Sequence, residues 1–229
     1  FKHLVRRNTP MIYIVENNGV YGLTKGQYSA TIEQGVELKH HGKSRYLPVD
    51  ICMEALTSHA TFVARSFAGD PKQVKELIKA AYSHNGIAVL DIISPCVTFN
   101  NISKMHSYNW GKDHESRLHD MSYVPAYENI TVEDFQRGEV REVKMFDESI
   151  LRLKKLDKEY DPTNRWDAAK MLEEAYENDL LVTGLIYVQT GMPTLHDKFN
   201  LPAHPLNRTP DELLRPQKEM IDAANALMY

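Results

Sequence analysis

Apolar runs alternate with helical patterns along the first part of the chain. MIYIV (11–15) is a short continuous apolar run, and TFVARSF (61–67) and GIAVLDIISP (86–95) are two more. Runs of this kind, apolar on both faces, are typical of parallel strands that helices cover on both sides. Between the strands, the pattern predicts one helix over 47–60 and a second that begins after Asp70.

The second helix carries end signals. Asp70 is a favoured N-cap because its side chain can accept from a free backbone N–H, and Pro71 suits the first turn. The apolar stripe consists of Val74, Leu77, Ile78 and Ala81, and Asn85-Gly86 ends it. Strands and helices in alternation predict an α/β fold with a doubly wound, mostly parallel sheet.

The following part of the chain is more polar. Residues 102–164 are expected to be loop-like, with two edge strands around YVPAYENI and REVKMF. The charge-rich stretch LRLKKLDKEYD (151–161) predicts a solvated strand or helix face. A helix is predicted over 165–180, followed by a last strand, LVTGLIYVQ (181–189).

Three segments result from this pattern. Residues 1–101 and 102–189 are interpreted as parts of one domain, and 190–229 as a C-terminal arm that is Pro-rich up to 209 and helical from Pro210. The arm carries more apolar residues than a free tail would, which indicates that it packs on another surface.

Composition excludes several classes of protein. Of the 229 residues, 42% are apolar and 25% charged, as in ordinary globular chains. A net charge of −4 argues against a nucleic-acid partner, and no apolar run approaches the length of a membrane span. Two cysteines make no disulfide framework, so we expect a reducing cytoplasm. FKHLVRRN at the start resembles the back half of a basic helix, which suggests the C-terminal part of a longer polypeptide.

Two polar loops follow the first and third predicted strands. They are ENNGVYGLTKGQ (16–27) and SPCVTFNN (94–101), and ligands in such sheets bind at the carboxyl ends of the strands. An asparagine oxygen suits Mg²⁺ that also holds phosphate oxygens, and Gly19 and Gly22 allow a phosphate close to the backbone. An ordinary Asn-Gly turn without a ligand is the alternative that these residues leave open.

The longer string N-N-x-x-Y-G-L-T-K-G-Q resembles the second half of the thiamine diphosphate motif in β subunits of 2-oxoacid:ferredoxin oxidoreductases. The resemblance extends to FVAR (62–65), HNGIAVLDIISPCVTFNN (84–101) and GLIYV (184–188). It implies a thiamine diphosphate-binding fold with a C-terminal extension. The G-D-G that opens the family's motif is expected in an upstream part.

The resemblance also implies roles for single residues. Asn18 would ligate Mg²⁺ through its side chain and Val20 through its backbone carbonyl. Gly22, Leu23 and Thr24 would line the diphosphate, with Leu23 also near the reacting end and selective for substrate.

The same resemblance assigns a lysine and a cysteine. Lys25 would face the carboxylate at the far end of the substrate, and Cys96 would be one of four thiolates on a 4Fe–4S cluster, with the other three upstream. Cys52 has no partner motif and is interpreted as structural. Asn17 is expected to be a buried structural amide, and no histidine spacing indicates a metal site.

The function implied is CoA-dependent oxidative decarboxylation of 2-oxoglutarate to succinyl-CoA with reduction of ferredoxin, or the reverse carboxylation. The cofactors would be thiamine diphosphate, Mg²⁺ and the cluster, with coenzyme A as co-substrate. The partners would be ferredoxin and an α subunit that carries the activating glutamate. Each αβ heterodimer is expected to pair into a heterotetramer.

Other functions stay open at this point. They are a pyruvate-specific or broad-range 2-oxoacid:ferredoxin oxidoreductase, an iron-free thiamine diphosphate-dependent decarboxylase, and a non-catalytic binding module. The L-T-K string and the positive charge of Lys25 favour 2-oxoglutarate, because pyruvate ends in a methyl group that an ammonium cannot pair with.

Overall fold

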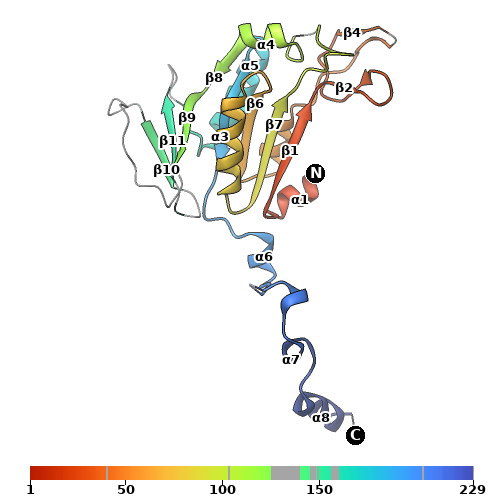
Figure 1. The fold of residues 1–229 in the computed structure, drawn as a ribbon, viewed down its shortest axis with the longest axis vertical. Helices are drawn as coiled ribbons and strands as arrows, with labels where there is room; N and C mark the ends of the chain where they lie inside the picture. Colours follow the sequence, from red (N-terminus) through yellow and green to blue (C-terminus); the bar gives the residue numbers. More distant parts are fainter. Residues whose placement is uncertain are drawn as a thin grey trace. The chain divides into compact units, whose positions relative to one another are not determined.

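A five-stranded sheet with strand order β1-β7-β6-β12-β8 is at the centre of the first part of the chain (Figure 1). The computed structural model describes residues 1–39, 41–102, 104–124, 140–144, 148, 150–155, 160–202 and 204–228. They form two compact units, 1–195 and 196–229. No helix in these described segments is long and apolar enough to cross a membrane.

The five-stranded sheet consists mostly of parallel strand pairs. Its strands are β1 (Met11–Asn17), β6 (Phe62–Phe67), β7 (Ile87–Ile93), β8 (Glu115–Arg117) and β12 (Leu181–Val188). β7 pairs in parallel with β1 and with β6, and β8 pairs in parallel with β12. Only the β12–β6 pair of this sheet is antiparallel. The doubly wound, mostly parallel sheet predicted from the pattern is confirmed.

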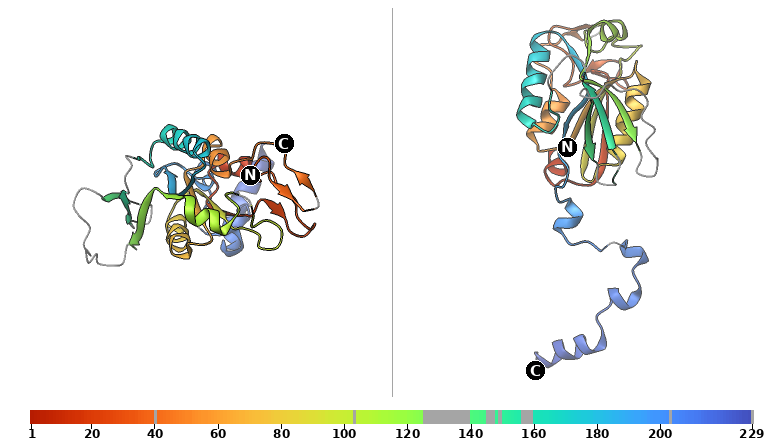
Figure 2. Two further views of the ribbon diagram at one scale, coloured as in Figure 1. Left: turned by 90° about the horizontal axis from the view of Figure 1, so that it is seen from above. Right: turned by 90° about the vertical axis from the view of Figure 1, so that its left-hand side faces the viewer.

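Helices cover both faces of this sheet, as Figure 2 shows from above. They are α1 (Lys2–Arg6), α2 (Ile51–Thr57), α3 (Pro71–Tyr82), α4 (Tyr108–His114) and α5 (Arg165–Glu177). One core cluster joins α1, α2 and α5 to the sheet through residues such as Leu56, Leu172 and Ile186. A second cluster joins α3 to the opposite face through Leu77 and Leu90. The two clusters explain why β6, β7 and β12 are apolar on both faces.

The predicted helix ends are largely correct. The Asp70 carboxylate accepts from the Gln73 backbone N–H at 3.2 Å, so α3 begins at Pro71 as expected. The first helix is shorter than the pattern suggested, because Asp50 rather than an earlier residue is the N-cap of α2 and accepts from Met53 N–H at 2.8 Å.

The prediction of loop over 102–164 is wrong for part of that range. α4, β8 and β9 (His119–Val124) lie there, and β9 forms a three-stranded sheet with β10 (Val140–Lys144) and β11 (Ile150–Lys155). The expected strand at REVKMF corresponds to β10, and YVPAYENI lies mostly outside the described residues. α4 has weak helix formers, but its Gly111 lies directly against the Phe67 ring, and Tyr108 and Trp110 pack beside it. Tertiary packing therefore decides this helix.

Smaller elements complete the structure. Two hairpins consist of β2 (Val20–Tyr21) with β3 (Gln27–Tyr28) and β4 (Glu37–Leu38) with β5 (Gly42–Lys43). Near the end of the chain are α6 (Leu195–Lys198), a 3₁₀ turn (Leu206–Arg208), α7 (Asp211–Leu214) and α8 (Lys218–Ala226). None of these last helices buries a residue within its own unit. Pro216 separates α7 from α8, so the single helix predicted from Pro210 is two.

Two buried histidines make the stability of residues 1–195 depend on pH. Burial lowers the pKa of both His84 and His119 to about 4, and the His119 Nε2 atom accepts from Leu185 N–H at 2.9 Å. Both rings are neutral in the folded state but take up a proton near pH 6.5 when unfolded, so stability is complete above pH 6.5 and is lost toward pH 4. From pH 7 to 4.5 we expect each histidine to lower the free energy of unfolding by roughly 2 kcal/mol, measured by urea denaturation.

His119→Gln is the matched variant, since its amide oxygen can still accept from Leu185 N–H without titrating. Its unfolding free energy should depend less steeply on pH than that of the unaltered protein. Equal slopes in this range would contradict the assignment of His119.

Candidate functional site

The carboxyl ends of β1 and β7 place the two polar loops side by side. Asn17 at the end of β1 pairs with Ile93 at the end of β7, and Ser94 N–H donates to the Asn17 carbonyl at 2.8 Å. Residues 18–26 and 94–101 therefore leave the sheet next to each other. Because parallel strands present their carboxyl ends at one edge, this adjacency follows from the sheet itself.

The first loop is a hairpin between β2 and β3. Gly26 N–H donates to the Tyr21 carbonyl at 3.0 Å and Lys25 N–H to the Gly22 carbonyl at 3.1 Å, which closes the turn. Lys25 and Gly26 have φ angles of 66° and 88°, in the left-handed region. Within the described chain, the backbone N–H groups of residues 22–24 donate to no protein acceptor. Consecutive free N–H groups in a turn are suited to an anion such as a diphosphate.

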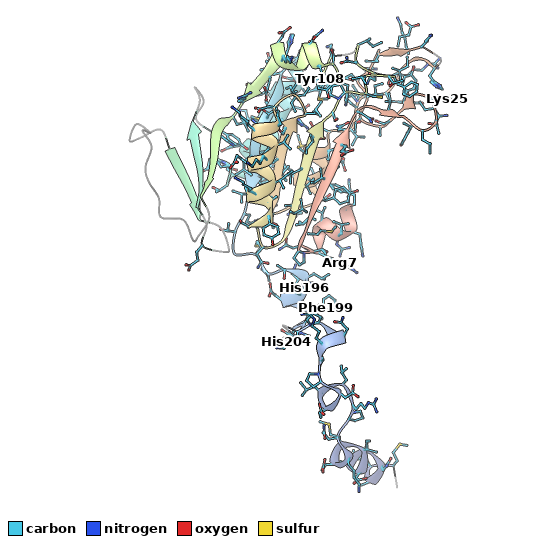
Figure 3. All side chains as sticks on the ribbon, viewed as in Figure 1. Arg7, Lys25, Tyr108, His196, Phe199 and His204 are labelled. Atoms are coloured by element: carbon cyan, nitrogen blue, oxygen red, sulfur yellow. The ribbon has the colours of Figure 1, made fainter. Side chains whose placement is uncertain are left out.

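The side chains of this turn are exposed. Leu23 is 99% exposed, and Thr24 Oγ1 donates only a long bond, 3.4 Å, to the Tyr21 carbonyl. The Lys25 side chain lies at the tip of the hairpin, away from the sheet (Figure 3). The structure thus brings Gly22, Leu23, Thr24 and Lys25 together on one turn, free to contact a ligand or another chain.

Asn18 and Val20 supply oxygen atoms at the base of the hairpin. Asn18 Oδ1 accepts from Val20 N–H at 3.0 Å, which holds the amide in place and leaves it a second lone pair. An amide oxygen and a backbone carbonyl fit Mg²⁺, which usually keeps water and phosphate oxygens as its other ligands. No group of three or more His, Cys, Asp and Glu side chains that could hold a metal exists among the described residues. Further ligands would therefore come from phosphate, water or other segments.

Asn17 is buried and links three segments, which agrees with its interpretation as a structural amide. Its Nδ2 donates to Asp91 Oδ1 at 3.1 Å, and its Oδ1 accepts from Thr31 Oγ1 at 2.6 Å. The same Oδ1 lies 3.0 Å from His106 Nε2. Since the amide N–H₂ is used by the Asp91 carboxylate, its oxygen must face His106, and Nε2 must donate.

The other nitrogen of His106 also faces an acceptor. His106 Nδ1 lies 2.9 Å from Glu33 Oε2, and the ring is fully buried. Burial by itself raises the pKa of Glu33, but the hydrogen bond and charge of His106 outweigh burial and hold the pKa below its usual range. Both ring nitrogens of His106 thus face acceptor oxygens, one from Asn17 and one from Glu33, and these two contacts fix the orientation of the ring.

A second ion group lies on the other side of Asn17. Arg65 in β6 donates to Asp91 at 3.0 Å and to Asp50 at 2.7 Å, and only 5% of Arg65 is exposed. Burial raises the pKa of Asp91, and the Arg65 charge offsets part of that rise. Burial by itself raises the pKa of Asp50 as well, but Arg65 outweighs it and holds the pKa below its usual range. Arg65 is therefore paired with two carboxyl groups at once.

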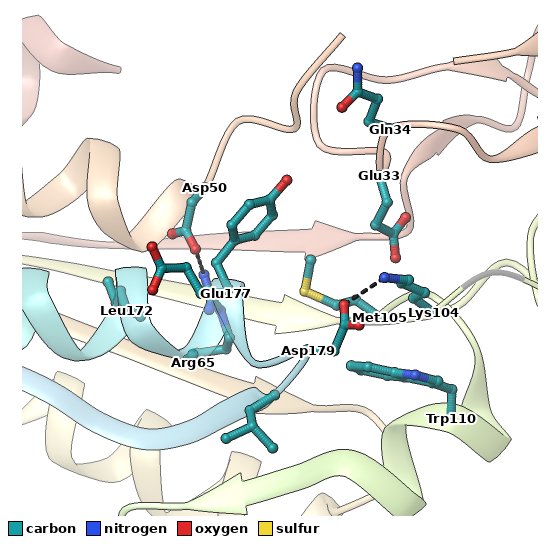
Figure 4. Close-up of a pocket in the computed structure, with 13 residues that line it drawn as sticks. Glu33, Gln34, Asp50, Arg65, Lys104, Met105, Trp110, Leu172, Glu177 and Asp179 are labelled. Carbon is teal, nitrogen blue, oxygen red and sulfur yellow. Dashed lines mark hydrogen bonds and ion pairs between the residues drawn. The ribbon is translucent and has the colours of Figure 1, made fainter. Parts of the chain in front are cut away.

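A cavity of about 380 Å³ reaches this ion group from the surface (Figure 4). Glu33, Asp50 and Arg65 form its polar wall, and Met105 and Trp110 form part of its apolar wall. A salt bridge of 2.5 Å between Lys104 and Asp179 lies at the same cavity. The cavity is therefore continuous with the buried polar groups beneath the two loops.

The two cysteines lie in different surroundings. Cys96 is partly exposed and packs against the small cluster formed by Val20, Ile32 and Leu38. Cys52 is fully buried and donates to the Ala64 carbonyl at 3.7 Å, and burial raises the pKa of its thiol. The burial of Cys52 agrees with its interpretation as structural, whereas Cys96 is only partly buried.

Sequence reasoning did not single out Glu33, Arg65, Asp91, Asn100 or His106. Arg65 and Asp91 had a usable signal, since each is a charged residue inside a predicted buried strand and needs a partner. Glu33 and His106 had none, because their pairing joins segments 73 residues apart.

Two family models match the chain. Residues 1–92 match the thiamine pyrophosphate enzyme C-terminal TPP-binding domain, and residues 135–202 match the C-terminal part of the pyruvate ferredoxin oxidoreductase β subunit. Both matches agree with the fold, whose loops lie at the carboxyl ends of β1 and β7.

Two individual proteins are similar to the chain in sequence. The chain is 34% identical over 203 residues to the β subunit of 2-oxoacid:ferredoxin oxidoreductase from Saccharolobus solfataricus, covering 87% of this chain and 58% of that one. It is 38% identical over 103 residues to the 2-oxoglutarate oxidoreductase subunit KorB of Mycobacterium tuberculosis, covering 43% of this chain and 27% of that one.

A solved structure matches as well. It is a 2-oxoglutarate:ferredoxin oxidoreductase from Magnetococcus marinus with 2-oxoglutarate, coenzyme A and succinyl-CoA bound. The TM-score is 0.63 at 26% identity, over 94% of this chain and 62% of that one. This chain thus spans less than two thirds of the length of either the S. solfataricus or the M. marinus protein. With the fold, the paired loops and these matches in agreement, the chain belongs to the β-subunit family of the 2-oxoacid:ferredoxin oxidoreductases.

Proposed function

We propose that the chain is the β subunit of a 2-oxoglutarate:ferredoxin oxidoreductase. The reaction would convert 2-oxoglutarate and coenzyme A to succinyl-CoA and CO₂ with reduction of ferredoxin, or run in reverse. The observation that carries this proposal is the adjacency of the Asn18 and Cys96 loops at one edge of the sheet, joined by a 3.2 Å bond from Asn100 Nδ2 to the Asn18 carbonyl. Support for the substrate comes from the KorB relatives and from the ligands in the M. marinus structure.

The hairpin is suited to hold thiamine diphosphate and Mg²⁺. Asn18 Oδ1 and the Val20 carbonyl would bind the metal, and the free N–H groups of residues 22–24 would bind the diphosphate. When bound, thiamine diphosphate supplies the carbanion chemistry that decarboxylates a 2-oxoacid. The chain's part is to hold its charged end at a turn that Asn17 and Asn100 keep in place.

Cys96 is suited to bind one iron of a 4Fe–4S cluster. Cys96 is partly exposed and lies on the loop next to the hairpin, whereas the only other cysteine, Cys52, belongs to α2 and is buried against β6. The remaining cysteines of the cluster would come from an upstream part of the polypeptide. Free thiols and such a cluster both suit a reducing compartment such as the cytoplasm.

Substrate preference would depend on the tip of the hairpin. Lys25 extends from the turn beside the expected diphosphate site, where an ammonium can pair with the second carboxylate of 2-oxoglutarate. Leu23, almost fully exposed, would contact the substrate next to the reacting carbon. A pyruvate-specific or broad-range enzyme is the alternative within the family, and the ratio of activities on two substrates distinguishes them.

A partner chain would complete the site. Leu23 is 99% exposed and Tyr21 of the same hairpin 57%, so a second chain that covered them would remove apolar surface from water. We propose that an α subunit covers them, that the β subunit is inactive alone, and that αβ heterodimers pair into a heterotetramer. Ferredoxin would be the electron acceptor.

Two functions of other classes would require different residues of the same loops. An iron-free thiamine diphosphate-dependent decarboxylase would need Asn18 but not Cys96. A non-catalytic binding module would need neither. Cofactor and iron contents of the assembled enzyme distinguish the three.

Asn18→Ala removes the proposed metal ligand. At limiting Mg²⁺ we expect the dissociation constant of thiamine diphosphate to rise by roughly tenfold or more, because a lost charge-assisted contact costs about 1.5–3 kcal/mol. Calorimetric titration of the cofactor-stripped αβ enzyme measures this. Asn109→Ala on the exposed face of α4 is the control, and an equal affinity in both variants would refute the ligand assignment.

Cys96→Ser removes the proposed cluster ligand. We expect the variant to lose visible absorbance and to contain less iron and sulfide per β subunit, because a serine hydroxyl is a poor ligand for an iron–sulfur cluster. Cys52→Ala should keep the full content. A complete cluster in the Cys96→Ser enzyme would show that this cysteine is not a ligand.

Lys25→Ala tests the substrate. We expect kcat/KM for 2-oxoglutarate to fall by about 10- to 100-fold and that for pyruvate to change little, since one charge-assisted hydrogen bond is worth about 1.5–3 kcal/mol. Lys72→Ala on the remote helix α3 is the control. Equal losses for both substrates would make Lys25 a cofactor or folding residue instead.

A further inference from the structure

The loop that carries Cys96 contacts the loop that carries Asn18 through several side chains. Asn100 closes the cysteine loop, since its backbone N–H donates to the Cys96 carbonyl at 2.8 Å. Its side chain then crosses to the other loop and donates from Nδ2 to the Asn18 carbonyl at 3.2 Å. Asn100 is only 1% exposed, so water cannot replace this donor without opening the contact.

Gly19 is held between two side chains of the segment that follows β7. A Cβ atom at Gly19 would lie 2.9 Å from Asn100 Nδ2 and 3.0 Å from His106 Nδ1, and its φ is +71°. His106 is itself fixed by Glu33 and Asn17, as described above. The peptide groups on both sides of Gly19 therefore have little freedom to turn, and these groups carry Asn18 and Val20.

A third contact lies at the far end of the hairpin. The Phe99 ring packs under Gly26, where a Cβ would meet Phe99 Cδ1 at 3.1 Å. Cys96 and Phe99 both pack against the cluster that contains Val20. Both ends of the 19–26 hairpin thus contact the cysteine loop, Gly19 through Asn100 and Gly26 through Phe99.

We propose that Asn100 is a positioning residue that couples the Cys96 loop to the Asn18 hairpin, so that the affinity for thiamine diphosphate and Mg²⁺ depends on whether the cluster is bound at Cys96. This coupling rests on the proposed function for its two ligands. Binding a cluster would fix the 94–101 loop, and Asn100 would transmit that order to the Asn18 carbonyl. Such a coupling free energy is reciprocal, so the bound cofactor also protects the cluster.

Asn100→Asp tests the coupling with almost no change in size. The carboxylate has no N–H to donate and places a negative charge against the Asn18 carbonyl. Asn101→Asp is the matched control: it adds the same charge one residue away, on an exposed side chain, and keeps the oxygen that accepts from Tyr108 N–H at 3.0 Å.

The experiment uses the αβ enzyme stripped of thiamine diphosphate, with its cluster intact or extracted. Calorimetry gives the dissociation constant of thiamine diphosphate at saturating Mg²⁺, and iron content shows the state of the cluster. For the unaltered enzyme, extraction should weaken binding several-fold. Asn100→Asp should weaken binding about tenfold with the cluster present and show little further loss on extraction. Asn101→Asp should behave as the unaltered enzyme.

Several results would overturn the coupling. One is unaltered affinity in Asn100→Asp, another is equal weakening on extraction in all three enzymes, and a third is no effect of extraction on the unaltered enzyme. If Asn100→Asp does not assemble, Asn100→Ser, small and uncharged, is judged by the same criteria. An unaltered enzyme that binds no thiamine diphosphate at all would instead refute the proposed function.

Discussion

The polar groups beneath the two loops depend on the hydrogen bonds of the Asn17 side-chain amide. A buried charged or polar group is tolerated only when it is paired and hydrogen-bonded, and five titratable side chains meet beneath the two loops. Asn17 joins them, because its N–H₂ donates to the Asp91 carboxylate and its oxygen accepts from His106 Nε2. Reversing this amide would place donor against donor on one side and acceptor against acceptor on the other.

The ends of three strands are held in register by this arrangement. Asn17 belongs to β1, Asp91 to β7 and Arg65 to β6, and Glu33 and His106 connect the following segments to the same group. Removing Arg65 would leave the buried Asp91 carboxyl without its cation, which costs far more than the hydrogen bond itself contributes. The strand ends beneath the hairpin are therefore rigid, while the turn at its tip, which carries Leu23 and Lys25, is exposed. A rigid base with an accessible tip is consistent with the proposed binding of a cofactor at the base and of a substrate and a second subunit at the tip.

The helices of residues 196–229 differ from those of residues 1–195 in burial. Their helices bury no residue within their own unit, although side chains such as Leu213, Ile221 and Leu227 are apolar and exposed. Helices this short are marginal in water without tertiary contacts. The interpretation of this segment as an arm that packs on another surface stays a prediction.

The sequence by itself determined the three long strands of 1–101, the ends of α3 and the position of both loops, but not the two short hairpins. These features depend on local periodicity and capping, and parallel strands bring their carboxyl ends to one edge in any such sheet. Tertiary structure decided the rest. α4 forms because Gly111 allows it to lie on Phe67, against its weak helix propensity. His106 is hydrogen-bonded at both ring nitrogens only because the fold brings Glu33 and Asn17 to them. Such pairings join residues far apart in the chain, and no local pattern records which distant partner a buried polar group will find.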